Sequence, residues 1–593
     1  MNLLNNRPLL VFILFLSIFL LFSNGKVTSS MDVDVLRYSQ NLIDTGSIGS
    51  ESKLSNGTVY SPKTHLFYPL EGIGIILPVA FISKLSQFFN IDSTFLIFSS
   101  GSILFALAMM FMYKLFSLLV SNRKSLLFVL AIGLATPVFV LSKMLFPEPF
   151  VMFAISGSLY YYFKFSIKRS EISLLYCGLL TGLTLIMRPD SPIFYSLMII
   201  LVLVKLFNYK ASTKKYLYFF AGIVVFTTVF FFNNYLKFGS FIETGYTVNK
   251  YHRNEVITAL QSDIIELPDR IQSKLITAQE AVKADKNSNI SKQLVSEYYS
   301  LDKSLKDKNS YLLDLKENEK FRINDVLAAK GDEGFARLLK DYFYGLYLIL
   351  IFPNRAIFFL SPIFLFVVFG IKGFYERFKL ESIFYSLIFF AYLSLYALRA
   401  PYGYSGTAAW GIRYMLPMFL ILSLFLTGVD KFLNPDHPKY KLFKYSFLSL
   451  LVLSALFQII GSAINYQHVQ MPLENVITQV YGKENIRMSR IQLMTKANSS
   501  LLLNNAQILT GNVPEVIKPH LSEDVIKYNI KPQYTNNSGP NDWFFYDLVI
   551  AEQKQLTGNL KNPSNYKLLF FVLIMLAIGS SYYVIRGKKI IKT

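Results

Sequence analysis

The sequence predicts an all-helical polytopic membrane protein. Of its 593 residues, 53% are hydrophobic and only 16% are charged, and the mean hydropathy is +0.38. Long apolar segments recur along the whole chain, which is typical of membrane-spanning helices. The single cysteine, Cys177, excludes an internal disulfide and a thiolate metal cluster.

Twelve apolar segments are predicted to span the membrane, and charge sets their direction. They cover residues 8–23, 94–120, 125–146, 150–163, 172–187, 191–204, 216–236, 356–371, 382–398, 412–429, 445–464 and 565–585. The net charge of +21 would suggest nucleic acid in a soluble protein, but here many Lys and Arg lie in short loops between apolar segments. The positive-inside rule places the loops at Lys124, Lys214 and Lys441 in the cytoplasm, and no nucleic-acid partner is expected.

Residues 69–90 are apolar but interrupted by Pro69, Gly72, Gly74 and Pro78. We predict that this segment lies along the outer interface and does not cross the membrane. Counting it as a thirteenth span would reverse every later loop and place nearly all basic clusters outside.

This topology divides the chain into five parts. Residues 1–254 and 341–464 form a transmembrane core, 255–340 an outer helical insertion, 465–564 a small extracytoplasmic domain, and 565–593 the last span with a basic cytoplasmic tail. The insertion is predicted from helical spacing such as Leu301, Leu305, Leu312 and Leu315. The first outer loop, residues 24–68, contains the stretch MDVDVLRY, which we interpret as the start of a catalytic loop.

Ionisable residues gather at the outer ends of the predicted spans. An ionisable group at the end of an apolar segment is energetically unfavourable unless it is paired or hydrated, so a shared outer cavity is predicted. The candidates are Asp32, Asp34, Lys63, His65, Glu148, Arg188, Asp190, Glu243, Arg355 and Arg413. Carboxylates can act as general bases and arginines can hold a phosphate, which fits transfer of a group from a lipid phosphate. The same set equally fits a transporter of anionic substrates.

Several motifs in order resemble the GT-C class of membrane glycosyltransferases. MDVDVLRYSQNLIDTGS, followed by GTVYSPKTHLFYPLEGIGIILPVAFISKL, is similar to the first outer loop of that class. The segments MLFPEPF, GLLTGLTLIMRPD, NYLKFGSFIETGY, FPNRAIFFLSP and YSGTAAWGIRYMLP follow in the expected order. The last three resemble proteins related to the dolichyl-phosphate-mannose protein mannosyltransferases, and the resemblance covers roughly residues 8 to 430.

The resemblance implies a hexosyltransferase in the cell membrane with its active site facing outside. A sugar, mannose or another hexose, would move from a polyprenyl-phosphate donor to a protein, lipid or glycan acceptor. Asp34 matches the catalytic Asp of the class, with Asp32 as the alternative, and Glu148 corresponds to the acidic residue of the second outer loop. Arg355 and Arg413 are candidate phosphate ligands.

Other roles stay open at this stage. Tyr246 and Trp410 are further candidate substrate contacts, although Trp410 also fits an aromatic membrane-interface anchor. No motif requires a cofactor, and a divalent cation remains open. The alternative functions are a transporter or flippase of lipid-linked saccharides and a polymerase or ligase of surface polysaccharide.

Overall fold

The structure is a computed structural model that describes most of the chain. The described residues are 6–23, 30–54, 58–70, 72–89, 93–245, 247–248, 252–285, 288–317, 332–353, 355–398, 410–463 and 563–586, with a few single residues beyond 501. This part is almost entirely helical, which confirms the predicted all-helical class. The predicted domain 465–564 lies outside the described residues, apart from those single positions.

Six of the described helical stretches are long and apolar enough to cross a membrane. They are Phe95–Leu119, Thr213–Phe238, Lys379–Ala397, Arg413–Lys431, Tyr440–Ala463 and Pro563–Ile585. These stretches indicate a membrane protein. The count of twelve spans, and the side of the membrane that each loop faces, stay predictions.

All twelve predicted spans fall on helices, some of them divided into short pieces. They are α1 (Arg7–Leu21), α4 (Ser93–Leu119), α5 (Asn122–Leu134) with α6 (Val138–Leu141), α7 (Pro147–Lys168), α8 (Glu171–Leu185), α9 (Pro192–Asn208), α10 (Thr213–Phe238), α16 (Ile357–Leu360) with η3 (Pro362–Leu365) and α17 (Phe366–Arg377), α18 (Lys379–Ala397), η5 (Arg413–Met415) with α19 (Leu416–Leu426) and η6 (Thr427–Lys431), α20 (Tyr440–Ala463) and α27 (Pro563–Arg586). Breaks occur at Pro137 and Pro362, because proline has no backbone N–H to continue a helix.

Helices α8 and α10 cross at glycines. A Cβ atom on Gly178 would lie 2.2 Å from the carbonyl oxygen of Phe219, and one on Gly222 would lie 2.3 Å from that of Leu175. Lipid tails are as apolar as the side chains they surround, so helices in a membrane associate chiefly through close packing of this kind. Another side of α10 faces outward, with Phe232 and Leu236 more than half exposed.

Ion pairs show which helix ends lie together. Lys124 pairs with Asp430, Lys205 with Glu381, Lys214 with Glu171 and Lys431 with Glu376. These pairs join the helix ends that carry the basic loops, and we call this side the basic end of the bundle. The other ends of these helices therefore lie together at the opposite end of the bundle. They are the starts of α7, α9 and η5 and the ends of α8 and α18.

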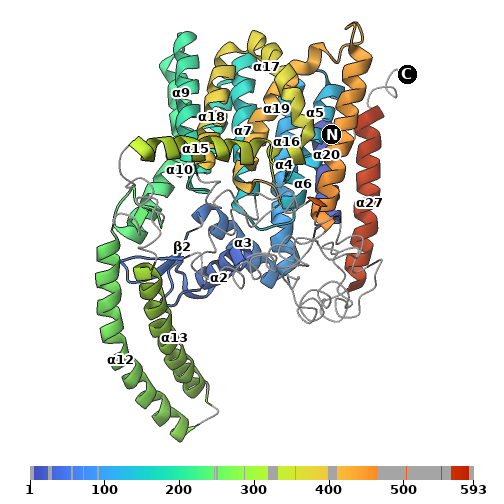
Figure 1. The fold of residues 1–593 in the computed structure, drawn as a ribbon. Coiled ribbons are helices and arrows are strands. Elements are labelled where there is room, and N and C mark those ends of the chain that lie inside the picture. Colours follow the sequence, from blue (N-terminus) through green and yellow to red (C-terminus); the bar gives the residue numbers. More distant parts are fainter. Residues whose placement is uncertain are drawn as a thin grey trace.

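The first predicted loop forms an ordered layer at this opposite end (Figure 1). The loop contains α2 (Ser30–Thr45) and the antiparallel strands β1 (Thr58–Tyr60) and β2 (Phe67–Pro69). Helix α3 (Ile73–Phe88), which falls on the segment 69–90, completes the layer. MDVDVLRY therefore belongs to a helix and not to an irregular loop. Ser39 of α2 donates a hydrogen bond to the carbonyl of Ile76 in α3, and Figure 1 draws both helices beside the ends of the bundle helices.

The predicted insertion contains a hairpin of α12 (Arg253–Ala284) and α13 (Asn289–Glu317), which projects from the bundle (Figure 1). Its root packs Leu260 and Tyr311 against Val59 and Phe67 of the β ribbon. Asp263 ties the two parts together, because its carboxylate contacts Lys308 of α13 at 2.5 Å and, in the first loop, Tyr60 at 2.5 Å and His65 at 2.8 Å.

The charge of Asp263 is favoured by these contacts. Burial acts to raise the pKa of Asp263, but the hydrogen bonds from Lys308 and Tyr60 outweigh it, so the pKa lies below its ordinary value. Burial and the same carboxylate raise the pKa of Tyr60.

Helix α15 (Asp332–Leu350) runs through the predicted boundary between 340 and 341 and crosses the bundle helices in Figure 1. It packs against the last part of α18. Gly345 lies so close to Ala397 that a Cβ atom would come within 1.9 Å of the Ala397 carbonyl oxygen.

Candidate functional site

Glu148 is the centre of a buried charged cluster at the opposite end of the bundle. It lies in the first turn of α7 between Pro147 and Pro149, and its side chain is 0% exposed. A carboxylate in the first turn of a helix is favoured by the helix dipole. Full burial of a carboxylate nevertheless requires charged partners.

Two arginines supply the opposite charge. Nη1 of Arg188 lies 3.6 Å, and Nε of Arg413 3.4 Å, from Oε1 of Glu148. Arg188 follows the end of α8, whereas Arg413 opens η5 before α19, so three separate bundle elements meet here. The Arg413 guanidinium also lies 4.3 Å from the centre of the Phe146 ring, a cation–π distance.

Asp190 and tyrosines hold Arg188 in place. Nη2 of Arg188 donates to Oδ2 of Asp190 at 2.8 Å, and the Tyr396 hydroxyl donates to the same oxygen at 2.5 Å. Tyr392 donates to the backbone carbonyl of Asp190 at 3.0 Å. Tyr414 stacks on Tyr396 with ring centres 5.4 Å apart and accepts a hydrogen bond from Arg413. The arginine positions are therefore fixed from α18 and η5.

Several polar atoms of this cluster have no hydrogen-bond partner among the described residues. They are both carboxylate oxygens of Glu148, Nη1 of Arg188 and Oδ1 of Asp190. A buried polar atom without a hydrogen bond typically costs about 1–3 kcal/mol and requires an explanation. Since donors and acceptors are both left open, the cluster has the capacity to bind a ligand that carries both, such as a phosphate next to a hydroxyl.

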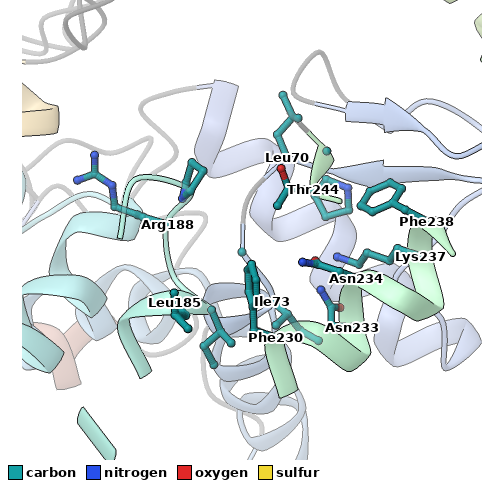
Figure 2. A pocket seen from close by; sticks show the side chains of 15 residues that line it. Leu70, Ile73, Leu185, Arg188, Phe230, Asn233, Asn234, Lys237, Phe238 and Thr244 are labelled. Carbon is teal, nitrogen blue, oxygen red and sulfur yellow. The ribbon is translucent and has the colours of Figure 1, made fainter. Parts of the chain in front are cut away.

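A small pocket adjoins the cluster through the backbone of Arg188. It has a volume of about 60 Å³ and lies between the start of α3 and the ends of α8 and α10. Figure 2 shows Asn233, Asn234 and Lys237 directed from α10 toward Ile73 and Thr244, with the Arg188 side chain directed away from them. Asn234 and Lys237 are buried, so the pocket has polar groups within apolar walls.

Four predicted site residues thus come together, namely Glu148, Arg188, Asp190 and Arg413. Asp34 is also buried, in α2, and α2 packs on α3. The start of α3 in turn contacts the end of α8, because the Gly74 N–H donates to the Ile186 carbonyl at 3.0 Å. Asp34 therefore lies in the layer that packs on the end of α8, close in sequence to Arg188.

The other predicted residues lie elsewhere. Lys63 donates to the Tyr235 carbonyl, His65 binds Asp263 of the hairpin, and Glu243 pairs with His252. Trp410 is buried in a separate apolar cluster, where its indole N–H donates to Gln458 at 2.9 Å. Trp410 therefore packs against α20, and it is not a membrane-interface anchor.

Three further predicted site residues lie in a turn between two helices or have side chains outside the described part of the chain. Arg355 is buried in the turn between α15 and α16. Tyr246 and the side chain of Asp32 lie outside what the structure describes.

Sequence reasoning missed the residues that support the cluster. Tyr392 and Tyr396 stand four positions apart at the end of one apolar segment and so share a helix face, which is a readable signal. The pair Asn233–Asn234 and Lys237 interrupt the end of another apolar segment. In both cases the polar groups mark the side of a helix end that packs inside the protein.

The described residues contain no group of three or more His, Cys, Asp or Glu side chains arranged to hold a metal ion. The chain matches no protein-family model, and a search of curated proteins finds no similar sequence.

Proposed function

We propose that this chain is a membrane glycosyltransferase that moves a sugar from a polyprenyl-phosphate donor to an acceptor on the outer face. The proposal is carried by the surroundings of Glu148. Its carboxylate is fully buried between Arg188 and Arg413, and neither of its oxygens has a hydrogen bond to a described residue. The cluster lies at the end of the bundle away from the basic loops, which the positive-inside rule assigns to the cytoplasm.

The arginines suit the leaving group of this reaction. During transfer the bond between the sugar C1 and the phosphate oxygen breaks, and the electron pair stays on the phosphate. Arginine can bind that growing negative charge through two parallel hydrogen bonds. Arg188 is already held by Asp190 and Tyr396, so it needs little reorganisation when a phosphate arrives.

A carboxylate must accept the proton of the attacking hydroxyl, so that the acceptor oxygen can form the new bond to C1. Asp34 is our candidate for this base, with Asp32 as the alternative. Glu148 is our candidate for orienting the two arginines, because it contacts both. Mannose or another hexose is the proposed sugar.

The test uses purified protein and a polyprenyl-phosphate sugar, with donor binding and turnover measured separately. Asp34→Asn keeps the side-chain shape but removes the proton acceptor, so we expect transfer to fall by about 10²-fold or more with donor binding retained. Asp32→Asn is the matched control. Loss of transfer in Asp32→Asn alone would move the base to Asp32.

Arg413→Ala should have the opposite effect and weaken donor binding, because it removes an anion contact. Arg413→Lys should restore binding only in part, since an ammonium group cannot make the bidentate contact. Donor that crosses the membrane with its sugar–phosphate bond intact would favour the alternative, a transporter of lipid-linked saccharides. Absence of donor binding by the wild type would contradict both.

A further inference from the structure

Helix α15 presents an apolar face that no described part of the protein covers. Leu339, Phe343 and Tyr347, together with Ile351 directly after the helix end, follow one another at intervals of four residues. They are 41%, 63%, 44% and 62% exposed. Residues at this spacing share one side of a helix. We call these four side chains the α15 face.

The α15 face cannot turn inward, because other residues of the helix are fixed to α18. Ile349 is fully buried, and the Tyr342 hydroxyl lies 3.0 Å from the hydroxyl of Ser394. Gly345 touches the backbone at Ala397, where any side chain would clash. The exposure of the α15 face is therefore built into the packing.

The setting of α15 indicates what covers this face. Figure 1 shows α15 lying across the bundle helices, so it would run along the plane of a membrane that they cross. Helix α18, against which α15 packs, also exposes apolar side chains, among them Leu387 and Phe390. A one-sided apolar helix in this position is typical of helices that lie within the lipid interface.

The contact with α18 also links α15 to the charged cluster. Ala397, which touches Gly345, follows Tyr396 directly, and Tyr396 hydrogen-bonds to Asp190 and Arg188. A hydrocarbon chain on the α15 face would therefore end close to the arginines that suit a phosphate. We infer that the α15 face binds the isoprenoid chain of the lipid-linked substrate and guides its phosphate to Arg188; this inference rests on the proposed function.

The first experiment detects the chain directly and needs no turnover. The native Cys177 is buried, so a Cys177→Ser background with Phe343→Cys gives one accessible thiol for a nitroxide spin label. In phosphatidylcholine nanodiscs, adding a long-chain polyprenyl phosphate should immobilise this label. The same label at Ile276→Cys, on the exposed hairpin, should not respond. An unchanged spectrum at position 343 would show that ordinary bilayer lipid covers the face and would overturn the inference.

The second experiment compares donors that carry the same sugar on a long or a short isoprenoid. In Phe343→Ser/Tyr347→Ser we expect KM for the long-chain donor to rise about tenfold, corresponding to about 1.4 kcal/mol of lost contact, with kcat unchanged. KM for the short-chain donor should not change. The hairpin variant Ile276→Ser/Tyr299→Ser is the control, because its two side chains are similarly exposed.

The outcomes separate the two proposals. An equal rise in KM for both donors, or no rise for either, would overturn the role of the α15 face. Immobilisation of the label together with no transfer by the wild type from either donor would contradict the proposed glycosyltransferase but support binding of the isoprenoid chain.

Discussion

Among the described residues of the bundle, two glutamates are buried, one at each end, and their surroundings differ. Glu381, at the basic end, is 2% exposed and accepts hydrogen bonds from Tyr162 at 2.9 Å and from Lys205 at 2.5 Å. Glu148, at the opposite end, is 0% exposed, yet both its oxygens lack a hydrogen bond among the described residues. Both carboxylates have cationic neighbours, but of the two only Glu381 accepts hydrogen bonds from described residues.

This difference separates a structural charge from a functional one. A buried ion pair with all its hydrogen bonds can hold helices in register, whereas open polar atoms reduce stability unless something else binds them. The end with Glu148 also gathers Arg188, Asp190 and Arg413, while most ion pairs at the basic end reach solvent. Unfavourable burial is thus concentrated where we propose that the substrate binds.

The largest expected effect comes from removing a cation beside each glutamate. Arg188→Ala leaves Glu148 and Asp190 buried without their shared partner, and we expect a loss of about 3–5 kcal/mol of stability. Lys205→Ala should cost less, about 1.5–3 kcal/mol, because Tyr162 still donates to Glu381 and Lys205 is 14% exposed. Thermal unfolding midpoints in one detergent measure both. Arg188→Lys is the charge-conserving control, and a smaller shift for Arg188→Ala than for Lys205→Ala would break the comparison.

A smaller but more specific effect should follow from neutralising each glutamate. Glu381→Gln loses charge-assisted hydrogen bonds and should lower the unfolding midpoint while turnover stays near that of the wild type. Glu148→Gln has no hydrogen bond to lose, so its midpoint should change less, whereas transfer should fall by about 10²-fold because the arginines lose their common orienting charge. Turnover and unfolding are measured on the same samples. Equal losses of transfer in both variants would remove the distinction.

The smallest effect concerns Asp263, a third carboxylate, which ties the hairpin to the first loop outside the bundle. Its lowered pKa means that its contribution to stability is complete above the ordinary Asp value of 3.8 and is lost as the pH falls through its lower folded value. Asp263→Asn should cost about 1–3 kcal/mol near neutral pH. The difference between wild type and variant should shrink in acid, as followed by proteolysis of the hairpin from pH 7 to pH 3. A difference independent of pH would show that the charge of Asp263 contributes nothing.

Charge alternation predicted much of this arrangement. The loops at Lys124 and Lys214 were assigned to one side from the sequence, and in the structure both lysines form ion pairs at the basic end of the bundle. The side of the membrane that this end faces stays a prediction. The same alternation placed Glu148, Arg188 and Arg413 on the other side. This works because Lys and Arg in short loops are strongly biased to one face of a membrane.

Contacts inside the bundle could not be predicted in the same way. An aromatic residue in an apolar segment can face lipid or a neighbouring helix. Trp410 was interpreted as a substrate contact or an interface anchor, whereas it packs against Gly461. MDVDVLRY was assigned to the first outer loop because it follows the first apolar segment, and that placement does not say whether the stretch is helical. Helix α15 was divided by a domain boundary because its first half is charged and its second half apolar.

The glycine crossing between α8 and α10 has a consequence for sequence variation in this chain. Replacing Gly178 or Gly222 by alanine would leave the hydropathy of both segments almost unchanged, yet the added methyl group would meet a backbone carbonyl at 2.2 or 2.3 Å. The two helices would have to separate. Arg188, which follows the end of α8, would then move relative to Asn234 and Lys237 at the end of α10. A substitution that every hydropathy scale scores as neutral would thus act as a spacer between the two walls of the pocket.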